Sequence, residues 1–259
     1  MVFNKNELIL DRVRSLTFHD LATNEMLLRL TSLEEPSLGC TAEGEEVTDA
    51  IGAVITTLYR AKKATFSATN SLVSLDLAAA QYGTKKVVAD EMNKIVDYTY
   101  EIITIPEEGT TVKLKHTPSN TVGYIYSIVN NEVGTAYTAG ASASETEFVM
   151  GENGTITLPT GLTGKIFVEY QYESTSAVAV HNYSANFPES GSVIIYAYFR
   201  DKCNDNLLYS GKIICPKAKL NPESVELALT STGKHPFEFT MMQDYCNEDQ
   251  LLFSIVVSD

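Results

Sequence analysis

Apolar and polar residues alternate along much of this chain, with the period of two that is typical of a half-buried strand. Between residues 61 and 70, Ala64, Phe66 and Ala68 alternate with polar residues. Residues 193–200 (VIIYAYFR) are apolar at neighbouring positions as well, which indicates a central strand buried on both faces. These patterns predict a chain made mostly of strands.

One stretch changes to a helical period directly after its strand. After residue 70, apolar residues recur mostly three and four positions apart, which predicts an amphipathic helix near residues 71–82. Asn70 or Ser71 can cap its start and Gly83 can end it. The helical residues that we expect to pack against the sheet are Leu72, Leu75, Leu77 and Tyr82.

Residues 107–172 differ from the rest of the chain in the spacing of their apolar segments and turn residues. Short apolar strands are separated there by dense turn signals, and Asn153-Gly154 between two apolar segments indicates a tight hairpin. Short strands at this spacing are typical of a small β-sandwich. We therefore interpret residues 107–172 as an inserted, small β-sandwich-like unit with its own core.

The remaining segments predict one main domain that the insertion interrupts. Residues 1–35 read as an N-terminal arm and a first strand, because their apolar positions fit neither period well. Residues 36–106 and 173–259 then form a β domain. The predicted fold class is mainly β, a β-barrel or sandwich with one flanking α-helix, together with the inserted β unit.

Composition and charge narrow the classes of function. The 259 residues carry a formal net charge of −14, which argues against an electrostatic grip on nucleic acid. The same charge suits a surface that DNA must pass without sticking. No apolar run has the length of a membrane helix and the N-terminus lacks a signal-peptide pattern, so we expect no membrane association.

Candidate chemistry is sparse. The four histidines are scattered, and no cysteine pair has the spacing of a zinc site, so we expect no metal, no cofactor and no enzymatic activity. Two interpretations stay open for the cysteines: free thiols in a protein made in a reducing cytoplasm, or covalent links within or between subunits. The four cysteines are Cys40, Cys203, Cys215 and Cys246.

The polar segment of residues 39–49 is rich in acidic residues. Taken alone, this composition predicts a solvated loop. Its acidic residues are Glu43, Glu45, Glu46 and Asp49.

Several segments together resemble the tail tube proteins of tailed bacteriophages. The resemblance lies in the acidic GEEVTDAIGAVI segment, the ATFSATNSLVSLDLAAAQYG strand-to-helix turn, and the C-terminal segments YSGKIICPKAKLNPESVELALT, KHPFEFTMMQDYC and LLFSIVVSD. It covers about 150 residues and leaves out the arm and the insertion.

The resemblance implies a non-enzymatic structural protein of the virion tail, assembled in the cytoplasm of a bacterial host. It implies subunits that close into rings, commonly hexameric, which stack into a tube through an N-terminal arm and an extended loop. DNA passes through the channel without specific binding, and other tail proteins, including a sheath where one exists, are partners. Glu43, Glu45, Glu46 and Asp49 become candidates for the lumen or for contacts between rings.

Two other functions fit the residues less well. One is a different virion component, such as a head–tail adaptor, a tail terminator or a decoration protein. The other is a β-sandwich module that binds a glycan or a protein through residues 107–172.

Overall fold

The computed structural model describes residues 7–202, 204, 206–223, 225–227, 233–244 and 250–258. Strands account for 57% of the structure and helices for 5%, which confirms the predicted mainly β class. The chain forms two compact units. The larger unit combines Met1–Lys86 with Val180–Asp259, and the smaller unit is Val87–Ala179.

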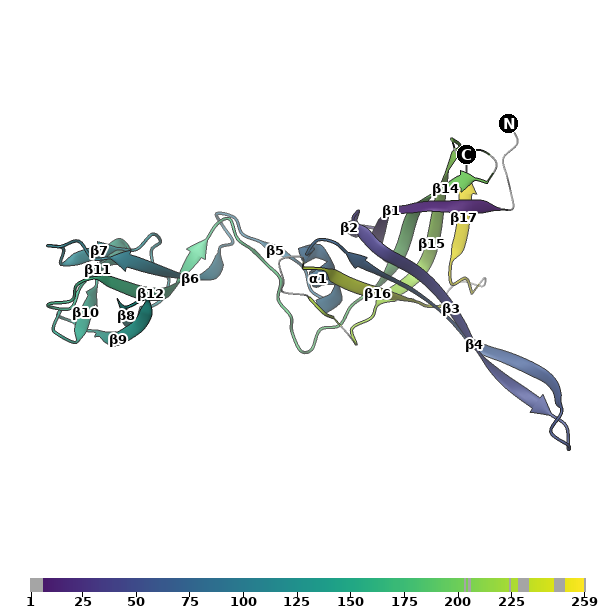
Figure 1. Cartoon of the computed structure of the whole chain (residues 1–259), viewed down its shortest axis with the longest axis horizontal. Helices are drawn as coiled ribbons and strands as arrows, with labels where there is room; N and C mark the ends of the chain where they lie inside the picture. Colours follow the sequence, from purple (N-terminus) through teal and green to yellow (C-terminus); the bar gives the residue numbers. More distant parts are fainter. Residues whose placement is uncertain are drawn as a thin grey trace. The chain divides into compact units, whose positions relative to one another are not determined.

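In its described part, the larger unit is built on one barrel-like sheet (Figure 1). The strand order is β2-β1-β14-β15-β16-β4-β3, and β17 also pairs with β15. Their bounds are β1 Leu8–Asp20, β2 Met26–Leu30, β3 Leu33–Thr48, β4 Val54–Asn70, β14 Ser190–Asp201, β15 Leu208–Leu220, β16 His235–Met241 and β17 Ser254–Ser258. The central position that the sequence predicts for residues 193–200 is confirmed, since β14 pairs with β1 on one side and β15 on the other.

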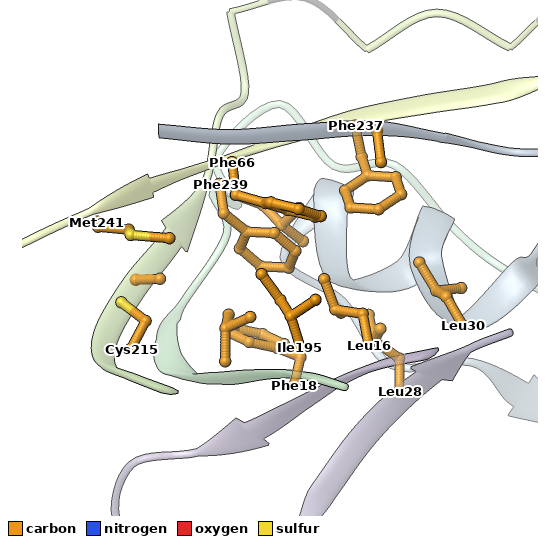
Figure 2. Packing of buried hydrophobic residues seen from close by; sticks show 14 of the residues in the cluster. Leu16, Phe18, Leu28, Leu30, Phe66, Ile195, Cys215, Phe237, Phe239 and Met241 are labelled. Carbon is orange, nitrogen blue, oxygen red and sulfur yellow. The ribbon is translucent and has the colours of Figure 1, made fainter. Parts of the chain in front are cut away.

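Alternating residues of these strands fill one hydrophobic core. Phe18 of β1, Phe66 of β4 and Phe239 of β16 lie within it, and the Phe18 and Phe239 rings are 5.2 Å apart (Figure 2). Leu77 contributes from the helix. Strands far apart in sequence are therefore held on one shared core face.

The first strand covers residues whose apolar pattern did not predict a strand. Residues 8–20, expected to belong to an arm, form β1 and pair along its length with β14. The register shifts between Leu10 and Arg12 and again between Val13 and Ser15. Each bulge inserts a residue and so breaks the period of two. Residues 1–6 of the expected arm lie outside the described residues.

The acidic segment is not a loop, and this prediction is wrong. Residues 39–48 belong to β3, which pairs with β4 in antiparallel register from Leu33↔Asn70 to Thr48↔Val54. Only residues 49–53, which connect β3 to β4, lie outside the strands. The sequence pattern misses the strand because neither face of its outer half is buried, so no apolar alternation is required there.

Helix α1 (Leu75–Tyr82) begins later than predicted. Its cap is Ser74, whose hydroxyl accepts from the Leu77 backbone N–H at 3.2 Å, and not Asn70 or Ser71. Gly83 ends the helix as predicted, with φ of 65°. A Cβ at Gly83 would lie 2.1 Å from the Phe187 carbonyl oxygen, so only glycine fits.

The smaller unit has a seven-stranded sheet in the order β6-β12-β8-β9-β10-β11-β7. The bounds are β6 Ile95–Thr104, β7 Thr111–Lys113, β8 Tyr124–Val129, β9 Glu132–Ala139, β10 Glu147–Met150, β11 Thr155–Thr157 and β12 Lys165–Ser174. Ile125, Phe148 and Ile166 are fully buried in a core of its own. The unit extends beyond the expected residues 107–172, because β6 pairs with ten residues of β12.

The smaller unit has a tight turn at Asn153-Gly154, and its two ends lie side by side. Asn153 and Gly154 both have positive φ, as the expected tight hairpin requires, and β10 pairs with β11 around them. At the ends of the unit, β5 (Val87–Val88) pairs with β13 (Val178–Ala179). The chain therefore enters and leaves this unit through two adjacent strands.

A buried histidine joins β16 to α1 in the larger unit. His235 is 1% exposed, and its Nδ1 accepts from the Ser74 backbone N–H at 3.4 Å. Its Nε2 therefore carries the proton and donates to Gln81 Oε1 at 2.6 Å. Burial lowers the pKa of His235 below its usual value.

We expect this histidine to make the larger unit sensitive to acid. Because the pKa is lower in the folded chain, the unfolded chain takes up the proton first as the pH falls below about 6.5. The free energy of unfolding should then fall by up to about 1.4 kcal/mol for each pH unit. Urea denaturation at pH 7.5 and 5.5 measures this loss. His235→Gln should reduce the difference between the two pH values, whereas the control His181→Gln should keep it; equal pH dependence in all three proteins would contradict the assignment.

Candidate assembly surfaces

The outer parts of β3 and β4 form a hairpin that runs beyond the other strands of the sheet (Figure 1). We call residues 43–60 the distal hairpin. Glu43 lies opposite Arg60 at its base, and Thr48 lies opposite Val54 near its tip. All but one of its residues are exposed, and the exception, Thr57, is half-buried. The distal hairpin therefore contributes little to the core of its own subunit.

Large apolar side chains lie on this exposed hairpin. Ile51 is 88% exposed, Tyr59 75% and Ile55 66%. Val47, Val54 and Leu58 are exposed as well. Apolar residues concentrated on an exposed strand pair are typical of a surface that another chain covers.

The four acidic residues expected at the lumen or between rings do not form one cluster. Neighbouring residues of a strand point to opposite faces, so the side chains of Glu45 and Glu46 point away from each other. The Glu45 carboxylate pairs with Arg60, and Glu43 lies 3.8 Å from Lys63. Both pairs are exposed and contribute little to stability.

Asp49 has a local structural role at the hairpin tip. Its Oδ1 accepts from the backbone N–H groups of Ile51 at 3.0 Å and Ala53 at 2.8 Å. Gly52 supplies the positive φ of 85° that the turn requires. This carboxylate shapes the turn, a role that the residue spacing alone did not indicate.

The helix residues expected to pack on the sheet divide into two groups. Leu77 is fully buried and Tyr82 is half-buried. Leu72 is 64% exposed and Leu75 43%, so the expectation that these two pack against the subunit's own sheet is wrong. The late start of α1 explains this, because it leaves Leu72 in the connection before the helix and places Leu75 on its first turn.

The solvent face of β1 and β14 carries basic residues that the net charge conceals. Arg12 and Arg14 lie 5.5 and 5.8 Å from the centre of the Tyr198 ring, and Arg14 Nη1 donates to the Tyr198 hydroxyl at 3.0 Å. On the neighbouring strands, Arg29 lies opposite Thr17 and Lys212 opposite Tyr196. We call Arg12, Arg14, Arg29 and Lys212 the basic face. It is a second charged surface, in which Arg12 also lies 3.8 Å from the Asp11 carboxylate.

Other candidate sites are limited. Among the described residues, no group of three or more His, Cys, Asp or Glu side chains could hold a metal ion. Cys40 is free and exposed, and Cys215 is free and buried, which raises its pKa to about 11. Cys203 and Cys246 lie outside the described residues. No described helix is long and apolar enough to span a membrane.

Comparison with protein families places the chain in one of them. The model of the YomU/Tube protein family matches residues 8–250, which include both compact units. None of the curated proteins compared with the chain matches it.

Proposed function

The chain belongs to the YomU/Tube protein family, and from this we propose that it is the tail tube subunit of a bacteriophage. In this role, copies of the chain close into rings, and the rings stack into a tube through which DNA passes. The protein acts by assembly and not by catalysis. Its partners are further copies of itself, in rings that we expect to be hexameric, and other tail proteins.

The distal hairpin is the observation that carries this proposal. In an isolated subunit, this strand pair exposes six large apolar side chains to water, which is unfavourable in free energy. A neighbouring copy that covers the hairpin would explain why these side chains are apolar. Glu43, Glu45 and Glu46 lie on the same hairpin, which supports a place for them between rings. Ion pairs at such a contact set the register of the rings more than they add affinity.

The sheet of the larger unit supports ring closure. Within the described residues, β2 and β3 end the strand order, so each leaves one edge open. Open edges invite pairing with another chain unless they are covered. Pairing between neighbours around a closed ring covers every edge of this kind.

Light scattering during size-exclusion chromatography tests the proposal with purified full-length protein. We expect assemblies much larger than the 28.4 kDa chain, and they should grow as the protein concentration rises. Rings of one fixed size that never stack would favour an adaptor or terminator protein instead. A monomer at every concentration would contradict both functions.

We predict that the smaller unit is dispensable for assembly. Its core is separate, and β5 and β13 bring its two connections side by side, so a short Gly/Ser linker can replace residues 89–177. The shortened chain should keep the free energy of unfolding of the larger unit within about 0.5 kcal/mol and should still form the large assemblies. Loss of folding in the shortened chain, measured by circular dichroism, would instead make residues 89–177 part of the main domain.

A further inference from the structure

The smaller unit has an exposed aromatic face that its own core does not use. One face of β6, β12 and β8 packs on the core through residues such as Ile125 and Ile166. On the opposite face, Tyr98 is 68% exposed, Tyr100 64% and Tyr124 55%. We call Tyr98, Tyr100, Tyr124, Tyr126 and Phe167 the aromatic face.

Contacts between rings make most of this face continuous. Tyr100 stacks on Phe167 with ring centres 5.5 Å apart and an interplanar angle of 24°. Tyr126 lies 6.3 Å from Phe167, and Tyr124 lies 6.4 Å from Tyr126. The strand register supports the same arrangement, because Phe167 lies opposite Ile102 on one side and Tyr126 on the other. A platform of exposed rings of this kind marks a binding surface.

Hydrogen-bonding side chains lie between the rings on the same face. Glu169 is the direct neighbour of Tyr100 across the strands, and Gln171 is the neighbour of Tyr98. Each tyrosine also offers a hydroxyl group. Flat rings can stack on the C–H faces of a pyranose ring, while the carboxylate and the amide bond its hydroxyl groups. The combination fits a sugar better than a purely apolar partner.

Charge decides between the possible occupants. The smaller unit has twelve acidic residues and four lysines, a formal charge of −8. A nucleic acid or another polyanion is therefore repelled, and so is the same unit of a second copy. Along the three paired strands, the charged residues on this face are Lys165, Glu169 and Glu173. Glu173 forms an ion pair with Lys94 at 2.9 Å and Lys165 balances Glu169, so a polycation finds no concentrated acidic site there. An uncharged ligand meets none of these penalties.

From these observations we propose that the aromatic face binds a neutral glycan, a chain of uncharged pyranose residues. Tyr98 and Tyr100 stack on successive sugar rings, and Glu169 and Gln171 bond the hydroxyl groups between them. This binding does not require tube assembly. The smaller unit would then attach the protein to a polysaccharide.

Fluorescence anisotropy with labelled chitohexaose and cellohexaose tests the proposal on the full-length protein, with free dye as reference. We expect the wild type to bind at least one of them. Tyr100→Ala and Tyr98→Ala should each weaken binding roughly tenfold, as the loss of one stacking contact requires. Tyr100→Phe keeps the ring and should retain binding. The matched control Tyr183→Ala removes an exposed tyrosine of the larger unit that lies outside the distal hairpin, and it should bind as the wild type does.

Three results would overturn the proposal. The first is that neither oligosaccharide binds to the wild type. The second is that Tyr98→Ala and Tyr100→Ala bind as tightly as the wild type while their circular dichroism shows them folded. The third is that the two variants instead weaken self-association of the chain, which would make the aromatic face a contact between copies. Light scattering on the same samples reports assembly separately, so a failed glycan site leaves the tube proposal intact.

Discussion

Replacing Leu77 with aspartate is expected to unfold the larger unit. Leu77 is 0% exposed and packs in the core that β1, β4, β14 and β16 share. The substitution removes a buried leucine, which costs about 2–5 kcal/mol, and adds a carboxylate without a partner in an apolar site. The total stability of a domain is about 5–15 kcal/mol, so the combined loss is of comparable size. Circular dichroism and the urea midpoint measure the outcome.

Leu75→Asp is the matched control for this prediction. It makes the same chemical change two residues earlier on the same helix, at a side chain that is 43% exposed. We expect the variant to stay folded, with a loss of about 1 kcal/mol or less. An unfolded Leu75→Asp together with a folded Leu77→Asp would reverse the assigned orientation of α1. A folded Leu75→Asp that no longer assembles would instead place this end of the helix at an interface between subunits.

Shortening the distal hairpin is expected to abolish tube formation and to leave the subunit folded. Residues 45–58 can be replaced by Asn-Gly, which joins Gly44 to Tyr59 in a two-residue turn. No core residue is lost, because every replaced side chain lies outside the hydrophobic cores. The variant does lose most of the exposed apolar residues that we assign to the contact between rings.

Sedimentation velocity distinguishes the outcomes for the shortened hairpin. The expected result is a folded monomer or single ring where the wild type gives large assemblies. If the shortened chain assembles as the wild type does, the distal hairpin is not needed for the stacking of rings. Because the smaller unit is unchanged in this variant, its thermal unfolding serves as an internal control for correct folding.

The sequence predicted strands well where one face is buried. In β14, Val193, Ile195 and Ala197 are buried and alternate with half-buried residues, and the run of apolar residues at neighbouring positions predicted this strand. It failed for β3, since both faces of its outer half are exposed and the residues there are polar. It also failed for β1, where two bulges interrupt the alternation. A hydrophobic pattern records burial, so a strand that is not buried on one regular face escapes it.

The candidate surfaces were less predictable than the fold. Arg14 and Tyr198 are 184 positions apart, and only the pairing of β1 with β14 brings them together. The net charge of −14 gave no sign of such a basic face. The acidic residues were singled out by composition alone, which could not show that Asp49 holds a turn or that Glu45 pairs with Arg60. Leu72 and Leu75 were assigned to packing because spacing alone does not locate the first helical residue.

Electron microscopy of the purified full-length protein shows whether the chain forms a tube. The proposed function predicts stacked rings that form tubes with an open central channel, lengthening as the protein concentration rises. Particles of single-chain size at every concentration, with no rings or tubes, would contradict it.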